Sequence, residues 1–229
     1  GLEICRKDDD VLWEELKRKV ASGKAFGTNV RLISAAEAKE KFPLLDEESI
    51  RGAMWDPDAG LVTPRSQDVV RFAVEHAKEK GALKTYADTP ATGFEIENGR
   101  ITAVKTDKGT IKTNKVVIAS GIWGPLVGEM AGVPIPLMPV EHPLLFFGPL
   151  PETQEAEDFL VYPLMRDQGN SAYVRDTGKL HGGMLEWGFY EDKEPRLVDA
   201  EDIGNPDKTM MSDSMRYLDL EEVAEPLEK

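Results

Sequence analysis

The sequence of 229 residues predicts an α+β fold, in which an antiparallel sheet with flanking helices is joined to a smaller α/β segment. Three observations predict it. The N-terminal part has the apolar spacing and the capping residues of helices. The middle of the chain runs in the order helix, strand, meander of about three strands, buried strand. From about residue 137, short strand-like pieces alternate with turns, which indicates an antiparallel sheet.

The first 62 residues predict two helices and a strand. Residues 8–22 repeat apolar side chains at helical spacing, and they begin with three aspartates that favour the positive end of a helix dipole. Ser34 and Glu37 form a capping box that opens a short helix over residues 35–41. Residues 50–55 then predict a strand. The predicted buried face of the first helix consists of Val11, Leu12, Leu16 and Val20.

A further helix is predicted over residues 64–80. Thr63 suits its N-cap and Pro64 its first position, because proline needs no hydrogen-bond acceptor there. Gly81 follows as the left-handed residue that ends many helices. A strand is predicted next, over residues 83–86.

A meander of strands follows this helix. Asn98-Gly99 accepts the positive φ angles of a type I′ turn, so residues 94–97 and 100–105 predict a hairpin, with a third strand over 110–113. The wholly apolar run 116–119 predicts a strand that is buried on both faces, as in the middle of a parallel sheet.

The last third of the chain predicts an antiparallel sheet and a terminal helix. Strand-like pieces cover residues 142–147, 172–174 and 180–185, with turns between them. Residues 210–229 predict a helix with acidic side chains on its exposed face.

Composition excludes several classes of partner. The formal net charge is −14, from 42 acidic and 28 basic residues, and such a surface repels nucleic acids and anionic membranes. No apolar run reaches the roughly 18 residues that a membrane span needs, and no signal peptide is visible at the start. Cys5 is the single cysteine, so no internal disulfide can form and a reducing compartment such as the cytoplasm is expected.

Known phosphate and metal motifs are absent from the sequence. There is no Gly-x-Gly-x-x-Gly, no Walker loop, no Gly-x-Ser-x-Gly and no His-Glu-x-x-His. Asp56-x-Asp58-x-Gly60 fails the spacing of a calcium loop, and the histidines are too widely spaced for zinc, so no metal site is expected.

Five motifs in order resemble the D-amino-acid-oxidase-like FAD-dependent oxidoreductases. Each is weak alone, but the five follow one another at natural spacing. They are residues 60–64 before the helix, Gly81-Ala82 after it, Val104–Gly109, Val116–Trp123 and Met130–Leu137.

Within that superfamily, the sequence is most similar to the sarcosine and dimethylglycine dehydrogenases. The resemblance covers nearly the whole chain and thins after about residue 190. It is carried by residues 42–45, 52–55, Glu141-His142, Arg166-Asp167, Tyr173–Arg175 and Gly182–Glu186. Leu145 departs from the pattern, since several relatives have an aromatic residue there, and this leaves the exact amine substrate open.

The resemblance implies an internal fragment with three parts. Residues 1–62 and 137–229 would form the substrate-binding antiparallel sheet, and residues 63–136 part of an FAD/NAD(P)-binding, glutathione-reductase-like α/β domain. The glycine-rich stretch would precede this chain and a second flavin-binding stretch would follow it, so FAD is expected in the complete protein and not on the fragment. The fragment alone is expected to be colourless and inactive.

The resemblance also implies partners and a location. It implies oxidative demethylation of a small secondary or tertiary amine, and tetrahydrofolate as a partner of a downstream domain. In a eukaryote, the mitochondrial matrix is the alternative location.

The resemblance assigns roles to six residues. Ala91 would lie near the adenine, and Ser120, Gly121 and Trp123 at the end of the apolar run that faces the flavin. His142 and Tyr173 would be the active-site pair, in a cleft whose other wall is the tip of that run. The residues alone also fit plainer roles: a strand-to-loop turn at 120–123, and ordinary sheet positions for His142 and Tyr173. Arg175 could bind a substrate carboxylate, but a solvated arginine is the commoner case, and no binding role is assigned to it.

Two other functions stay open. One is a non-catalytic module of the kind found in the regulatory subunit of pyruvate dehydrogenase phosphatase. The other is an FAD oxidase of another amino acid or of a 2-hydroxy acid.

Overall fold

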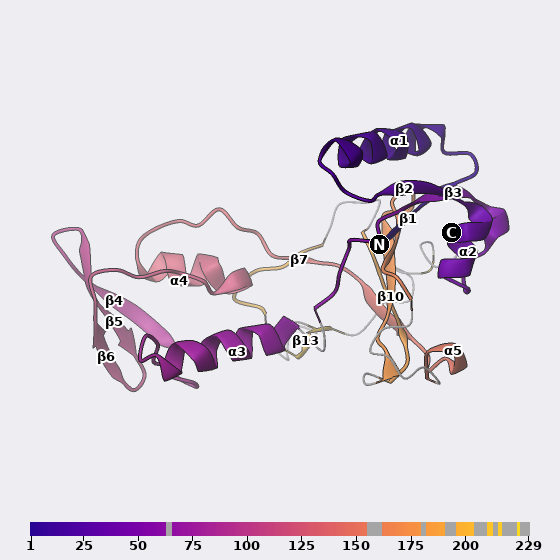
Figure 1. The fold of residues 1–229 in the computed structure, drawn as a ribbon. Helices are drawn as coiled ribbons and strands as arrows, with labels where there is room; N and C mark the ends of the chain where they lie inside the picture. The colour runs from indigo at the N-terminus through magenta and orange to yellow at the C-terminus, as the bar shows by residue number, and fades with distance from the viewer. Residues whose placement is uncertain are drawn as a thin grey trace. The chain divides into compact units, whose positions relative to one another are not determined.

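The chain forms two compact units in the computed structural model (Figure 1). The first unit comprises Gly1–Arg71, His142–Glu194 and Asp219–Lys229, and the second comprises Phe72–Glu141 and Pro195–Leu218. Each unit is described by itself. The structure describes residues 1–62, 66–154, 162–179, 182–190, 196–203, 210–212, 215–216 and 224.

A seven-stranded sheet forms the centre of the first unit. Its strands lie in the order β2-β3-β1-β9-β10-β11-β8, and neighbours are antiparallel except for the parallel pair β1 and β9. The mainly antiparallel sheet was predicted, and residues 50–55 form a strand with the predicted bounds. The strands are β1 (Leu2–Arg6), β2 (Arg31–Ser34), β3 (Ile50–Trp55), β8 (Leu144–Phe147), β9 (Met165–Asp167), β10 (Ala172–Asp176) and β11 (Leu185–Phe189).

Helices α1 (Asp10–Ala25) and α2 (Ala35–Lys41) confirm the two helices predicted in this unit. The side chain of Asp9 caps α1 by accepting a hydrogen bond from the Leu12 amide at 2.8 Å. The capping box of α2 is complete, since the Glu37 amide donates to Ser34 Oγ and the Ser34 amide donates to Glu37 Oε2. Two shorter pieces complete the unit, a 3₁₀ turn (Glu47–Ser49) and α5 (Pro151–Gln154).

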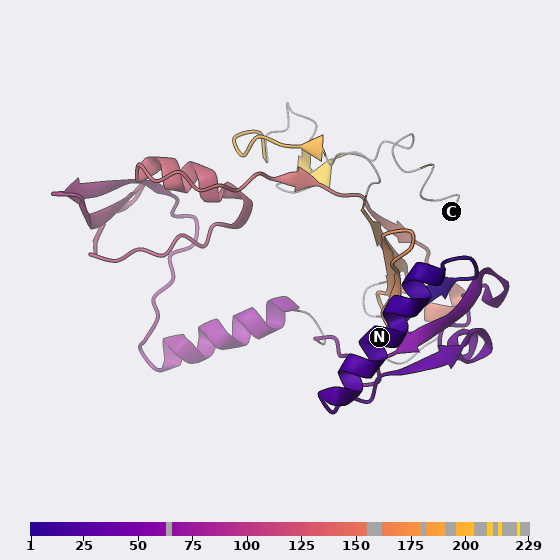
Figure 2. The same ribbon diagram turned by 90° about the horizontal axis from the view of Figure 1, so that it is seen from above.

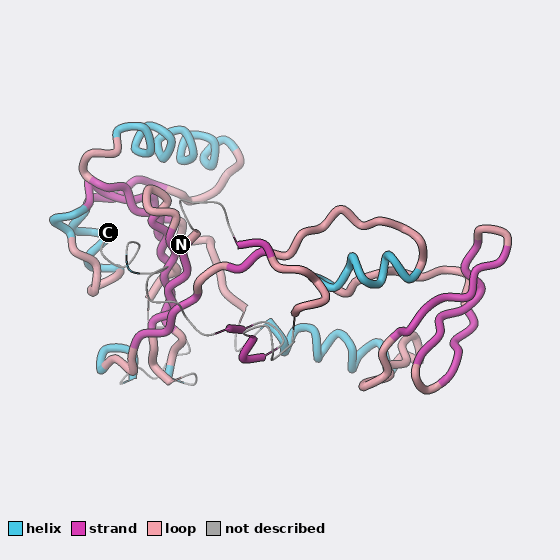
Figure 3. The backbone as a smooth tube through the Cα atoms, turned by 180° about the vertical axis from the view of Figure 1, so that it is seen from behind, coloured by secondary structure: helices cyan, strands magenta, loops and turns pink. Residues whose placement is uncertain are grey.

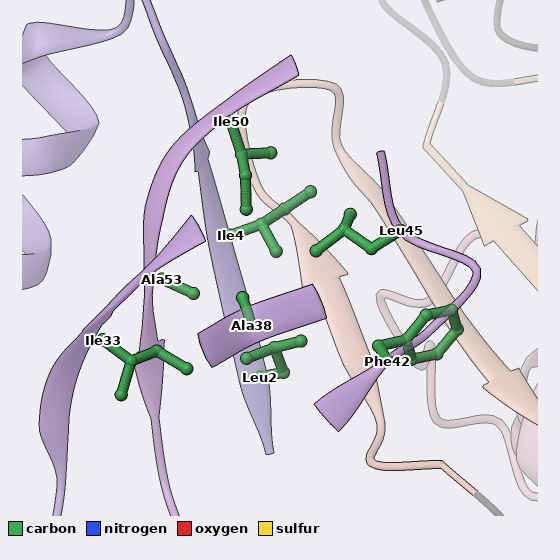
Figure 4. Packing of buried hydrophobic residues seen from close by; sticks show 8 residues of the cluster. All are labelled: Leu2, Ile4, Ile33, Ala38, Phe42, Leu45, Ile50 and Ala53. Carbon is green, nitrogen blue, oxygen red and sulfur yellow. The ribbon is translucent and has the colours of Figure 1, made fainter. Parts of the chain in front are cut away.

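Helices cover opposite faces of this sheet, because strand side chains alternate between faces. Leu2 and Ile4 of β1 point into the main core with α2 and its following loop (Figure 4). Cys5 points to the other face and packs against α1, which lies over these strands when they are seen from above (Figure 2). Val11 was predicted on the buried face of α1, but its side chain is 78% exposed, and Leu12, Leu16 and Val20 alone are buried. The main core consists of Leu2, Ile4, Ile33, Ala38, Phe42, Leu45, Ile50 and Ala53.

The second unit contains the predicted meander (Figure 3). Asn98 and Gly99 have φ angles of 51° and 74°, as a type I′ turn requires. Helix α3 (Ser66–Glu79) begins in the first unit and continues into the second, and Gly81 follows it with a φ of 68° as predicted. The remaining elements are β4 (Ala91–Glu97), β5 (Arg100–Thr106), β6 (Gly109–Lys112), a 3₁₀ turn (Gly121–Trp123), α4 (Gly124–Met130), β7 (Val140–Glu141), β12 (Arg196–Leu197), β13 (Met210–Ser212) and β14 (Met215–Arg216).

Two strands predicted in the middle of the chain are wrong. Residues 83–86 and 116–119 form no strand, and Val117 is 89% exposed. A strand requires a neighbour that supplies backbone hydrogen bonds, and neither segment takes part in any sheet of the described chain. Apolar composition alone therefore predicted pairing that these segments do not have.

Other boundaries in the last third also differ. His142 and Pro143 lie between β7 and β8, so the predicted strand over 142–147 starts two residues later. Residues 210–212 and 215–216 pair as β13 and β14, where a helix was predicted, because cross-strand pairing supplies the hydrogen bonds that a helix would make locally. The strand predicted over 180–185 is instead β11, which begins at Leu185. Thr63, Pro64, Leu180, His181 and most of the stretch after 216 lie outside the described residues.

Neither a membrane span nor a metal-binding cluster is present among the described residues. None of the helices there has both the length and the apolar character that crossing a bilayer demands. No group of three or more metal-binding side chains there could hold an ion.

Candidate active site

Tyr173, one of the two residues predicted to be catalytic, lies on one face of the neighbouring strands β8, β11 and β10. His142, the other one, lies just before β8. The strands pair directly, so residues opposite one another share a face. We call this surface the tyrosine face. Two rows of residues cross it. The first row consists of Leu144, Gly188 and Tyr173, and the second of Phe146, Glu186 and Arg175.

The tyrosine face is open at the edge strand. Leu144 and Phe146 of β8 are 44% and 49% exposed. On the opposite face of the same strands, Leu145, Ala172 and Phe189 are buried together, with Trp187 packed against them. At the edge strand β8, the tyrosine face is therefore the more exposed of the two sides.

Tyr190 joins His142 and Tyr173 into one cluster. His142 lies just before β8, and its ring contacts that of Tyr190 edge-on, with centroids 4.9 Å apart at 77°. The Tyr190 ring is 6.3 Å from that of Tyr173, and the Tyr190 amide donates to the Ser171 carbonyl at 2.9 Å. The structure thus brings the two predicted active-site residues together at one end of the tyrosine face.

Tyr190 and Gly188 were not predicted as site residues from the sequence. Tyr190 is two and four residues after Gly188 and Glu186, which a strand places on the same face. A glycine inside an aromatic strand is a further signal, since it marks a place where another group approaches closely. Both signals depend on knowing where β11 begins, and the sequence placed that strand too early.

Charges on the tyrosine face are already paired. Arg175 Nη2 donates to Glu186 Oε2 at 2.5 Å across the two strands, and the Glu186 side chain is buried. A buried carboxylate with this partner is stabilised by the charge-assisted hydrogen bond. The charge of Arg175 is therefore compensated by Glu186 on this face.

Tyr173 keeps its proton at neutral pH. Burial raises the pKa of the Tyr173 phenol above its ordinary value, and the nearby Tyr190 and Glu186 raise it further. A protonated phenol donates a hydrogen bond. Tyr173 is thus equipped to donate to a ligand on this face and not to abstract a proton from it.

The residues predicted to face the cofactor lie in the second unit. Ala91 begins β4 and pairs with Thr106 of β5. Ser120, Gly121 and Trp123 form the turn that leads into α4, and Gly121 has a φ of 57° that favours glycine. Ser120, Gly121 and Trp123 are thus held in one tight turn.

The turn at Ser120 fits part of a cofactor site. Ser120 Oγ is buried and has no hydrogen-bond partner among the described residues, and a buried hydroxyl without a partner is costly. No atom within 4 Å would meet a Cβ built on Gly121, so a flat group could approach the backbone there. These residues could line one side of FAD, although the chain has no glycine-rich cradle for its phosphates.

Comparison with known proteins decides the family. The DAO family, described as FAD dependent oxidoreductase, matches residues 1–218. The chain belongs to this family. The predicted resemblance is thereby confirmed, and the described fold is that of a DAO-family FAD-dependent oxidoreductase.

Curated relatives of this DAO-family chain include amine dehydrogenases. Human mitochondrial sarcosine dehydrogenase is 31% identical over 183 residues, which are 78% of this chain and 18% of the relative. Rat mitochondrial dimethylglycine dehydrogenase is 26% identical over 215 residues, which are 94% and 24%. The mouse regulatory subunit of pyruvate dehydrogenase phosphatase is 28% identical over 202 residues, which are 87% and 22%. The chain spans about a fifth of the length of these relatives.

A solved structure supports the same family. L-proline dehydrogenase from P. horikoshii superposes with a TM-score of 0.69 at 33% identity, covering 85% of this chain and 49% of that one. The DAO-family chain therefore spans about half of the chain of this relative.

Proposed function

We propose that this chain forms the substrate side of an FAD-dependent oxidoreductase that oxidatively demethylates a small secondary or tertiary amine. The observation that carries the proposal is the cluster of His142, Tyr190 and Tyr173 on the open tyrosine face of a DAO-family chain. Relatives named for sarcosine and dimethylglycine support the class of substrate.

FAD, when bound, would accept a hydride from the carbon next to the amine nitrogen. The chain would hold the amine for that transfer. The Tyr173 hydroxyl donates a hydrogen bond to the substrate, and the exposed His142 imidazole can take up a proton from a substrate ammonium, because only a neutral amine gives up the hydride. Tyr190 packs against both rings and limits their movement.

Ala91, Ser120, Gly121 and Trp123 are proposed to lie along the cofactor. Support comes from the unpartnered Ser120 hydroxyl and the glycine backbone beside it. Tetrahydrofolate as acceptor of the one-carbon unit is a further proposal, and it requires a domain outside this chain.

The test is the rate of flavin reduction in the complete protein. Stopped-flow absorbance near 450 nm follows bleaching after mixing with sarcosine, dimethylglycine or other small N-methyl amines. Tyr173→Phe and His142→Ala should each slow bleaching by about 10²-fold, because each removes a group that positions the amine or takes its proton. Tyr86→Phe, a change at an exposed tyrosine of the second unit, is the matched control and should leave the rate unchanged. Undiminished bleaching in both active-site variants would show that the tyrosine face is not the substrate side.

A second function has one observation in its favour, the similarity to the pyruvate dehydrogenase phosphatase regulatory subunit. It predicts that no amine, amino acid or 2-hydroxy acid in a broad panel bleaches the flavin. Bleaching by an amino acid or a 2-hydroxy acid alone would instead favour a different oxidase of the same family.

A further inference from the structure

Gly188 lies at the centre of the tyrosine face. It is buried in β11, opposite Tyr173 of β10 on one side and Leu144 of β8 on the other. Its φ angle is outside the left-handed region that requires glycine. Backbone conformation therefore does not explain why this position lacks a side chain.

The space over Gly188 is filled by Tyr173. A Cβ atom built on Gly188 would lie 2.1 Å from Tyr173 Cζ, 2.2 Å from its hydroxyl oxygen and 2.7 Å from Cε1. Real Cβ atoms essentially never approach another heavy atom within 3.0 Å. The tyrosine ring and a side chain at position 188 thus compete for one place.

The hydroxyl of Tyr173 consequently lies above the middle strand instead of pointing away from the sheet. On the same face, Leu144 and Glu186 occupy the neighbouring positions of the sheet, and the Tyr190 ring centroid is 6.3 Å from that of Tyr173. Any side chain at 188 would push the ring aside and move the hydroxyl away from these neighbours. Ring placement therefore depends on the absence of a side chain across the strand.

We propose that Gly188 is a positioning residue, whose missing side chain makes the room in which the Tyr173 ring lies and so fixes the place of the Tyr173 hydroxyl on the tyrosine face. The placement stands on geometry alone, whereas its effect on catalysis rests on the proposed function. The competing explanation is purely structural, because an aromatic side chain that covers a glycine on the neighbouring strand also stabilises a sheet.

The first test needs neither flavin nor substrate. The protein has five tyrosines, and labelling them with 3-fluorotyrosine lets 19F NMR follow each phenol through a pH titration, with Tyr173→Phe assigning one resonance. Burial raises the pKa of Tyr173, so displacement of the ring by Gly188→Ala should make this phenol titrate at lower pH than in the parent. Gly60→Ala is the matched control, because nothing lies within 4 Å of a Cβ there. An unchanged Tyr173 titration in folded Gly188→Ala protein overturns the proposal.

A double variant covers the case in which Gly188→Ala does not fold. In Tyr173→Ala/Gly188→Ala the ring is gone, so the added methyl group meets no clash and the protein should fold. If Tyr173→Ala alone folds and the double variant does not, Gly188 is needed for another reason, and the proposal is wrong.

Activity separates the placement from the proposed chemistry. In the complete protein, Gly188→Ala should lower kcat by about 10²-fold, the scale expected when a catalytic group moves by about 1 Å. In a Tyr173→Ala background, the same change should have little further effect, because the group that it displaces is absent. A displaced phenol with unchanged kcat would overturn the catalytic role of Tyr173 and leave the placement by Gly188 intact.

Discussion

Several buried carboxylates of the first unit have compensating partners. A buried charge destabilises a fold unless hydrogen bonds or an opposite charge compensate it. Each buried carboxylate here has such partners. The pairs are Glu3 with Lys19 at 2.7 Å, Asp167 with Arg6 at 2.8 Å, Glu186 with Arg175 at 2.5 Å, and Asp176 with the amides of Tyr162 at 2.8 Å and Gly178 at 2.9 Å.

Asp176 offers the clearest test at this scale, because it is fully buried and accepts from two backbone amides. Asp176→Ala leaves both amides without an acceptor and should lower the free energy of unfolding by about 3 kcal/mol. Asp176→Asn keeps one acceptor oxygen and should cost about half as much. Urea denaturation followed by circular dichroism measures both. Equal stability of the alanine variant and the parent would mean that water or another group serves these amides.

At the scale of elements, α2 combines several local signals. Hydrogen bonds from the Ser34 backbone and side chain lower the pKa of Glu37 below its ordinary value of 4.5. A carboxyl whose pKa is lowered in the folded state stabilises that state above its ordinary pKa. The stabilisation is lost as the pH falls through the lowered value, where the folded protein also takes up the proton.

The matched pair for α2 is the parent and Glu37→Gln. Glutamine can still accept the Ser34 amide hydrogen bond but does not titrate. As the pH falls from about 6 to about 3, the free energy of unfolding of the parent should therefore decrease relative to that of Glu37→Gln. Urea denaturation at a series of pH values checks this. A difference that stays constant across the series would assign the acid sensitivity to other groups.

Elements with local signals could be predicted from the sequence, and those that depend on distant partners could not. The capping box gave α2 its observed bounds, and Asn98-Gly99 gave the hairpin its turn. Residues 83–86 and 116–119 carry the composition of strands, but composition does not supply a neighbouring strand. Tyr190 and Gly188 were missed for the same reason, since their shared face follows from strand register. His142 and Tyr173 lie in one cluster with Tyr190, which agrees with the shared site that the resemblance implied, and their catalytic role stays a prediction.

At the scale of the whole molecule, apolar burial is concentrated in the first unit. Three buried clusters lie there. Among the described buried hydrophobic residues, Ala103 alone belongs to the second unit. Burial of apolar surface is the main source of stability, so the two units should differ in how easily they open.

Hydrogen exchange of residues 1–229 tests this difference. Amides of β4, β5 and β6 should exchange at least about tenfold faster than those of β1 and β3, which corresponds to an opening free energy lower by about 1.4 kcal/mol. Ile50→Ala, at a side chain 1% exposed in the main core, should cost about 2–5 kcal/mol. It should speed exchange in β1 and β3 while leaving the meander unchanged. If exchange in the meander rises in step with exchange in β1 and β3, the chain unfolds as one cooperative body, and the stability of the meander depends on the core of the first unit.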